Sequence, residues 1–156
     1  MAVSQIINAS LASGVPGKAN LPTGSVLQVV SFFEAGTISL SSGGSVAPVT
    51  ITPTSSTSKI LVCASCSVER TSGSTGNYIM VYVRRAGTTL GNTSSLLSAA
   101  GYNVTGGSRQ GMSVQYLDSP ATTSARTYDI YQDFSAAGGA SFNFYGANVT
   151  LLEIAA

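Results

Sequence analysis

The sequence predicts an all-β fold, an antiparallel β-sandwich of the jelly-roll kind with an extended amino-terminal arm. Three observations lead to this prediction. Short runs of β-branched and aromatic residues alternate with clusters of Gly, Ser, Thr, Asn and Pro, no helical period persists for three turns, and no internal repeat stands out. The 156 residues have the length of one domain. We expect the arm at residues 1–24 and the sandwich at residues 25–156.

The strands are predicted from the apolar runs between these breaker clusters. The candidates are Val26–Phe33, Val46–Thr52, Lys59–Arg70, Asn77–Arg85, Thr88–Thr93, Gly111–Asp118, Arg126–Phe134 and Ser141–Ile154. Leu96–Ala100 is a candidate for a further short strand. The last run is long enough to bend, and Gly146 is where we expect the bend because glycine in a strand often marks one.

Composition excludes several classes of function. Charged residues make up 8% of the chain, against about 25% in typical soluble domains, while hydrophobic residues reach 44%. The net charge of +1 is too small for a nucleic-acid or polybasic membrane surface, so we expect neither partner. The absence of histidine excludes Ser-His-Asp triads, Cys-His dyads and His-ligated zinc. No apolar run is long enough to span a membrane.

The charged residues that remain do not form a catalytic pattern. Asp129 and Asp133 share a strand face about 13 Å apart, wider than the roughly 5–9.5 Å that glycosidases use. Asp118 and Asp129 could approach across two strands, but a calcium site needs more ligands. Arg84 and Arg85 point to opposite faces, so we expect one in solvent and the other against a carboxylate or a subunit boundary. We therefore predict no enzymatic activity, no cofactor and no metal.

The two cysteines, Cys63 and Cys66, lie within one predicted strand. Residues three apart on a strand point to opposite faces about 10 Å apart, beyond the roughly 7 Å limit for a disulfide. Two thiols alone do not complete a tetrahedral zinc site. We expect both cysteines to be small buried hydrophobic residues, in a protein assembled in a cytosol.

The amino-terminal segment lacks the basic start and apolar core of a signal peptide. It nevertheless carries four sizeable aliphatic residues, Val3, Ile6, Ile7 and Leu11. Two interpretations remain open: a frayed tail, or an arm that becomes ordered by docking on a neighbouring subunit.

Several predicted strands are apolar on both faces. In Asn77–Arg85 neither face is polar, and in Ser141–Ile154 counting by two places Phe142 and Phe144 opposite Val149 and Leu151. A strand of this kind needs a second cover, which we expect to be another copy of the chain. The predicted self-association surface consists of Tyr78, Met80, Tyr82, Phe142, Phe144 and Tyr145.

Five stretches, taken in order, resemble the small β-domains of bacteriophage tail-fibre and related virion proteins. The resemblance covers about residues 21 to 154, and its most distinctive part is the run from Ile51 to Val62. The stretches are Leu21–Val30, Val49–Val62, Tyr116–Pro120, Arg126–Tyr131 and Leu151–Ile154.

The resemblance implies a homotrimeric jelly-roll protein of the virion, assembled in the host cytoplasm and without enzymatic activity. In the leading interpretation it is a fibre or appendage whose outer loops touch the host surface, including its glycans. The arm would bind another virion protein of the tail, baseplate or capsid. Members of the family usually follow a long fibre, whereas about 24 residues precede the domain in this sequence. This difference leaves two alternatives open, a short fibre held by its arm and a capsid cement or decoration protein. A carbohydrate-binding module unrelated to virions is a separate alternative.

Overall fold

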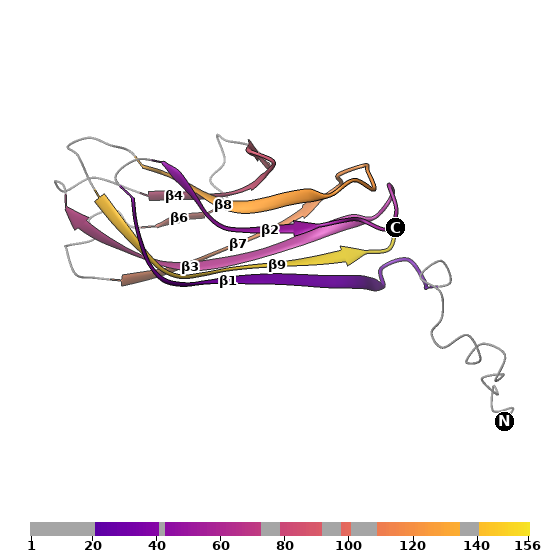
Figure 1. Cartoon of the computed structure of the whole chain (residues 1–156), viewed down its shortest axis with the longest axis horizontal. Helices are drawn as coiled ribbons and strands as arrows, with labels where there is room; N and C mark the ends of the chain where they lie inside the picture. Colours follow the sequence, from indigo (N-terminus) through magenta and orange to yellow (C-terminus); the bar gives the residue numbers. More distant parts are fainter. Residues whose placement is uncertain (1–20, 41–42, 73–78, 92–97, 101–108, 135–140) are drawn as a thin grey trace, which may run out of the picture.

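Two β-sheets lie face to face, with their strands running along the long axis of the molecule (Figure 1). The computed structural model describes residues 21–40, 43–72, 79–91, 98–100, 109–134 and 141–156. These residues contain no helix. Their strands are β1 (Val26–Leu40), β2 (Gly44–Ile51), β3 (Lys59–Ser72), β4 (Ile79–Arg85), β5 (Thr88–Thr89), β6 (Ser98–Ala100), β7 (Arg109–Asp118), β8 (Arg126–Phe134) and β9 (Ser141–Ile154).

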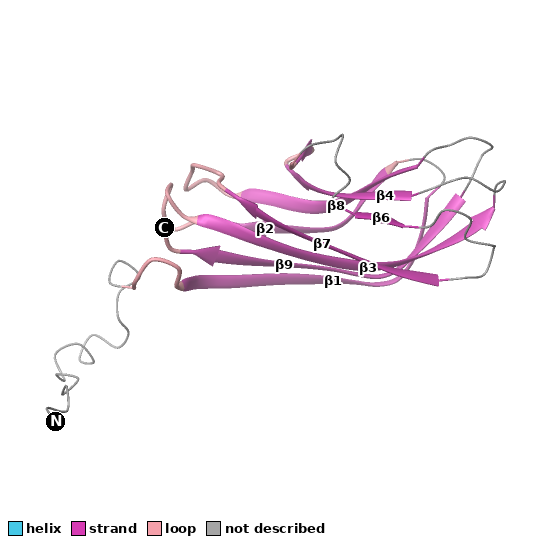
Figure 2. Ribbon diagram, turned by 180° about the vertical axis from the view of Figure 1, so that it is seen from behind, coloured by secondary structure: helices cyan, strands magenta, loops and turns pink. Residues whose placement is uncertain are grey.

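Both sheets are antiparallel, and each draws strands from both halves of the chain. Sheet A has the order β1-β9-β3-β7. Sheet B has the order β2-β8-β4, and the other side of β4 pairs with the short strands β5 and β6. The long strands alternate between the two layers along the sequence, as Figure 2 shows from behind. This is the strand order of a jelly roll, so the predicted all-β, jelly-roll-like sandwich is confirmed.

Most strands follow the predicted boundaries because the breaker clusters of the sequence end them. The main difference is β1, which continues to Leu40 instead of ending at Phe33. Its second part bends at Gly36, where φ is 105° and the register against β9 shifts. Beyond the bend Ile38 and Leu40 pack against the core, and this burial stabilises the extension. β5 ends at Thr89, earlier than predicted.

The core lies between the sheets and is built by alternate residues of the strands. β3 shows the alternation clearly, with every even-numbered residue from Ile60 to Val68 buried. The opposing sheet contributes inward-facing residues of β2, β4 and β8. The largest apolar side chains that are fully buried are Tyr128, Phe144, Ile51, Ile60, Ile79, Ile130 and Leu151.

β9 changes phase at Gly146. This residue has φ of 59°, and the register of β9 against both of its neighbours shifts there. The extra residue places Phe142 and Phe144 on the same core-facing side as Val149 and Leu151. The expectation that these phenylalanines face the opposite way is wrong, because an inserted residue reverses the alternation that counting by two assumes.

The end of β9 lies beside the start of β1, at the end of the sandwich that we call the base (Figure 1). Gly24 donates a backbone hydrogen bond to Ala155 (2.8 Å), and Ala155 donates one to Ser25 (2.9 Å). The described chain therefore enters and leaves the sandwich at the same end. The predicted arm residues Val3, Ile6, Ile7 and Leu11 lie outside the described residues.

Candidate interaction surface on sheet A

The outward face of sheet A carries aliphatic side chains that cross all four strands. Val29 of β1 stands opposite Leu152 of β9, which stands opposite Leu61 of β3. Leu61 in turn stands opposite Leu117 of β7. Residues directly opposite in an antiparallel sheet share a face and hold their Cβ atoms within about 5.5 Å. These four side chains form one continuous strip, which we call the apolar row.

The apolar row faces solvent. Its two ends are the most open, with Val29 57% exposed and Leu117 50% exposed, and the two leucines between them are half-buried. The strip widens toward the base through Val26 and Ile154, which are paired on the same face. Contiguous exposed apolar surface is uncommon on monomeric soluble proteins and marks an interaction site.

β1 adds a second apolar feature at the border of this face. Phe33 is 60% exposed, and its ring lies beside Gly146, where an added Cβ would stand 3.4 Å from the ring. Phe32, on the other side of the strand, is also exposed. Four of the five exposed large hydrophobic side chains of the described residues belong to β1, and the fifth is Leu117. Apolar exposure is thus concentrated on this strand and on the apolar row.

The outward face becomes polar away from the base. A shallow hollow floored by small side chains comes first, and beyond it the Arg109 guanidinium lies 3.7 Å from the centre of the Tyr145 ring. Arg109 also pairs with Glu69 at 3.4 Å. Asn143 Nδ2 donates to the Tyr145 hydroxyl (3.1 Å), and the Ser39 hydroxyl donates to Asn143 Oδ1 (2.6 Å). A partner on this face meets apolar groups at one end and polar groups at the other, which fixes its orientation.

A fully buried carboxylate organises the base. Glu153 accepts a hydrogen bond from Gln28 Nε2 (2.6 Å) and two from the backbone N–H and hydroxyl of Thr54 (2.7 Å each). Gln28 also donates to the Thr52 carbonyl (2.7 Å). These bonds tie β1, β9 and the loop between β2 and β3 together, so they fix the strand ends from which the apolar row projects.

The protonation of Glu153 follows from these bonds. Burial alone would raise the pKa of the carboxyl group, but the hydrogen bonds, headed by the one from the Thr54 hydroxyl, outweigh burial and hold the pKa of Glu153 below its usual value. The group is therefore ionised at neutral pH. Its acceptor oxygens are occupied by donors of the chain itself, which is the pattern of a structural carboxylate.

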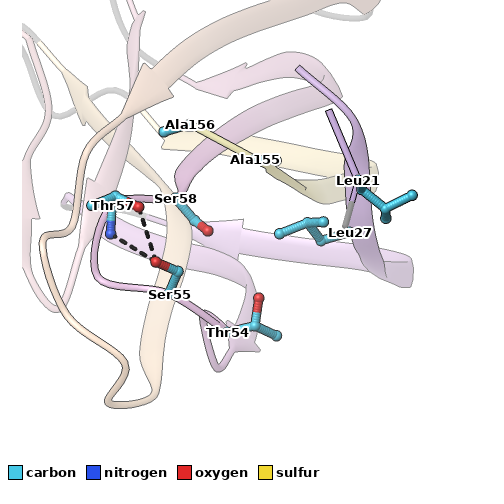
Figure 3. A pocket seen from close by; sticks show the side chains of 8 residues that line it. All are labelled: Leu21, Leu27, Thr54, Ser55, Thr57, Ser58, Ala155 and Ala156. Carbon is cyan, nitrogen blue, oxygen red and sulfur yellow. Dashed lines mark hydrogen bonds between the residues drawn. The ribbon is translucent and has the colours of Figure 1, made fainter. Parts of the chain in front are cut away.

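A pocket of about 320 Å³ lies at the base, close to this network (Figure 3). Leu21 and Leu27 line one part of it, and hydroxyl groups of the loop between β2 and β3 line another. Within that loop Thr57 donates its backbone N–H to the Ser55 hydroxyl (3.2 Å), as the dashed lines in Figure 3 indicate. The lining consists of leucine, alanine, serine and threonine residues and includes no charged side chain.

A second buried carboxylate links the two sheets. Asp118, at the end of β7 in sheet A, accepts two hydrogen bonds from Arg85 Nη1 (2.9 and 2.7 Å) and one from the Tyr128 hydroxyl (2.7 Å), both in sheet B. Burial, reinforced by the bond to Asp118, raises the pKa of Tyr128. The phenol thus stays protonated and donates at neutral pH, and the cluster clamps the sheets together.

Arg84 binds a different carboxylate, on the outward face of sheet B. It pairs with Asp129 at 3.1 Å, contacts the Ser45 hydroxyl and lies 3.9 Å from the centre of the Tyr131 ring. The two arginines point to opposite sides of β4, as expected, and each pairs with a carboxylate of its own. Asp118 and Asp129 consequently meet arginines on opposite faces of β4 and do not form a joint cation site.

The structure corrects the predicted self-association surface at three residues. Tyr82, Phe142 and Phe144 are 6%, 2% and 1% exposed within the single chain. They have no surface to offer a second copy, and for the phenylalanines the reason is the extra residue at Gly146. Met80 and Tyr145 are half-buried, and Tyr78 lies outside the described residues.

The cysteines point to opposite faces of β3, as predicted, and both are free thiols. Cys66 is buried in the core, and burial raises the pKa of its thiol to about 12. Cys63 is only half-buried on the outward face of sheet A, which corrects the expectation that both are buried. The difference follows from the alternation of β3, whose outward residues are covered by neighbouring strands alone.

The sequence also contains a signal for the apolar row, in strands other than those predicted to be apolar on both faces. The stretches that supply it, Val26–Phe33 and Ile60–Val62, have large apolar residues at consecutive positions. In a half-buried strand such residues cannot all face the core. The signal does not reveal the row itself, because the row arises from the register between four strands that are distant in sequence.

Comparison with known proteins does not assign the chain to a group. No known protein family and no curated protein sequence matches it. Among the described residues, no helix is long and apolar enough to cross a membrane. The same residues contain no group of three or more Cys, Asp or Glu side chains placed to hold a metal ion.

Proposed function

We propose that the chain is a non-enzymatic structural protein of a bacteriophage virion, which forms a homotrimer in a fibre or appendage whose outer loops contact the host surface. The virion assignment is supported by the resemblance of residues 21–154 to small β-domains of tail-fibre proteins. The self-association is supported by the structure, and the single observation that carries it is the solvent-exposed apolar row.

The apolar row supports self-association because the chain has few charged residues to keep an exposed apolar surface soluble. Charged residues are 8% of the sequence, and the four residues of the row cross the full width of sheet A. Burying an aliphatic side chain completely contributes about 1.5–3 kcal/mol, and association costs at least about 4 kcal/mol in lost freedom. The row supplies energy of this order, and the polar groups beyond it supply orientation.

The buried polar groups support a structural role over a catalytic one. Asp118, Asp129 and Glu153 each accept hydrogen bonds from donors of the same chain. A catalytic carboxylate needs reach to a substrate, and these three are turned to arginine, tyrosine, threonine or glutamine partners instead. Their shared effect is to hold strand ends and to join the two sheets.

The test of self-association is the mass of the purified chain in solution. We expect sedimentation velocity to give three times the 15.8 kDa of one chain. The double variant Val29→Lys with Leu117→Lys should shift the protein to one chain mass, because it places two charges in an apolar contact. Gln115→Lys is the matched control, since Gln115 is exposed on the same face of β7 and lies outside the apolar row. A wild-type protein that sediments as a single chain contradicts the proposal.

The place in the virion is tested by copy number. Quantitative mass spectrometry of particles that carry the chain should find a few dozen copies or fewer, as expected for a fibre. Hundreds of copies would contradict this and would identify a protein that decorates the capsid. A glycan array with the purified chain then tests the host-surface contact.

A further inference from the structure

The edges of the two sheets differ in how they are protected against pairing with another chain. An edge strand exposes unpaired N–H and C=O groups, and proteins usually block it with proline, a bulge, charge or a short covering strand. β2 contains Pro48 and a bulge between Val46 and Val49, where Ala47 has φ of 51°. The free side of β4 is covered by β5 and β6, which are two and three residues long.

The two edges of sheet A are β7 and β1. β7 begins with Arg109, whose side chain is 61% exposed, and its outward residues before Leu117 are Gly111, Ser113 and Gln115. β1 has a bulge between Val26 and Gln28 and a charge at Glu34, but none of these devices between those two points. Between Val29 and Phe33 it holds no charge, no proline and no bulge, and it pairs in unbroken register with β9 on its other side. We call this stretch of β1 the unprotected edge. β7 also runs from Gln110 to Leu117 without a charge, a proline or a bulge, but its exposed side chains before Leu117 are small or polar.

The unprotected edge is also the most apolar surface of the described chain. Val29, Phe32 and Phe33 are each at least 40% exposed, and they lie on both sides of the strand. A strand added to this edge would therefore gain side-chain contacts on both faces as well as backbone hydrogen bonds. Such an edge is a binding site for an extended apolar segment.

The chain itself contains a segment with this chemistry. In an extended strand the odd positions of residues 3–11 share one face, which is apolar except at Gln5, and the even positions share the other, which is polar except at Ile6. The odd positions hold Val3, Gln5, Ile7, Ala9 and Leu11, and the even positions hold Ser4, Ile6, Asn8 and Ser10. The first 17 residues contain no charged side chain. Nine residues in extended form span about 30 Å, a length that covers the unprotected part of β1.

Position and reach favour a segment from a neighbouring copy. The described chain begins with Leu21, which lines the pocket at the base and lies five residues before the start of β1 at Val26. Residues 12–20 can span about 30 Å when extended, enough to cross from one copy to the next. Val29 belongs both to the apolar row and to the edge, so a copy seated on the row lies next to the edge as well.

We propose that the free edge of β1 binds residues 3–11 of a neighbouring copy as an added strand. Each copy gives one segment and receives one, which is a head-to-tail exchange that closes in a cyclic assembly. The inference rests on the proposed self-association and names the groups that hold it together.

The experiment is photocrosslinking from the segment in the full-length chain. A photoreactive amino acid replaces Ile7, the protein is irradiated, and the products are separated under denaturing conditions and mapped by mass spectrometry. We expect a product of two chain masses, joined between position 7 of one copy and Leu27–Glu34 of another. A product of one chain mass joined to the same strand, or crosslinks confined to other strands, would overturn the proposal.

Variants of the edge sharpen the result. Ser31→Lys places a charge on the unprotected edge and should abolish the crosslink to β1. Ser113→Lys is its matched control, because Ser113 is exposed on the other edge of the same sheet, and it should leave the crosslink unchanged. Thermal unfolding of both variants verifies that they fold. An undiminished crosslink in Ser31→Lys would contradict the proposal.

The mass of the native sample in solution, measured beside the crosslinks, separates this proposal from the proposed self-association on which it rests. A trimer in solution whose crosslinks miss β1 removes the strand exchange and leaves self-association in place. A single-chain species removes both.

Discussion

Glu153 places a negative charge inside an apolar sandwich. The hydrogen-bond donors around the carboxylate stabilise this buried charge. Three donors from Gln28 and Thr54 surround the carboxylate, at 2.6 to 2.7 Å. They come from two separate parts of the chain and meet β9 at the base. The carboxylate thus replaces, at this one point, the apolar contacts that hold the rest of the core.

Glu153→Gln should lower the free energy of unfolding by about 1–3 kcal/mol, measured by chemical denaturation at neutral pH. The amide carries two N–H donors, so at least one of them would meet a donor of the chain and leave buried groups unpaired. Glu34→Gln is the control, because no hydrogen bond to the Glu34 carboxylate is found among the described residues. Equal stability of Glu153→Gln and the wild type would contradict this account.

The lowered pKa of Glu153 predicts that the stability of the fold depends on pH. Because the folded pKa of Glu153 is lower than its usual value of 4.5, the folded protein binds this proton less readily than the unfolded chain does. Its contribution to stability is therefore complete above that usual value and is lost as the pH falls through the folded pKa. Between about pH 6 and pH 3 the wild type should lose more stability than Glu153→Gln. Parallel pH profiles would rule this out.

Gln132 is the opposite case, because its buried amide lacks the donors and acceptors that surround Glu153 among the described residues. Its side chain is 0% exposed on the core face of β8, and neither amide atom has a hydrogen-bond partner among the described residues. Gln132→Met keeps the length of the side chain and removes the unpaired groups, so it should raise the free energy of unfolding by about 1 kcal/mol. Gln115→Met, at an exposed position, should leave it nearly unchanged. A loss of stability in Gln132→Met would instead indicate a bound water.

One glycine decides which side chains of β9 enter the core. Gly146 adopts φ of 59°, and the ring of Phe33 occupies the space beside it. Gly146→Ala should cost about 1–2 kcal/mol, because a Cβ disfavours this conformation. Gly111→Ala is the matched control on the same sheet, since nothing lies within 4 Å of an added Cβ there. Thermal unfolding measures both, and equal melting temperatures would contradict the prediction.

The positions of the strands were largely predictable from the sequence, whereas the side of each strand that faces the core was not. Breaker clusters such as the glycines and serines around residues 41–44 end strands by local chemistry, which is readable in a single chain. The phase change at Gly146 depends on how β9 meets β1 and β3, so the positions of Phe142 and Phe144 were beyond the reach of pattern counting. For the same reason the predicted self-association surface included residues that belong to the core.

The two outward faces of the sandwich have different chemistry. Sheet B presents the Arg84–Asp129 pair and the Tyr131 ring, while sheet A presents the apolar row and the edge of β1. Both apolar features lie toward the base, where the described chain enters and leaves. A cyclic assembly through sheet A would gather the bases of its subunits and leave the opposite ends free.

The order of strands in sheet A also governs when this surface can exist. β1 is the first of the described strands and β9 the last, and Gln28 and Glu153, which form a hydrogen bond between them, are 125 residues apart. Contacts this distant in sequence make folding slow, because the intervening chain must be ordered before they form. A nascent chain that has not yet delivered β9 has neither the middle of sheet A nor Leu152. The surface for the proposed assembly therefore forms only after β9 has been synthesised, and a chain that stops before β9 would lack it.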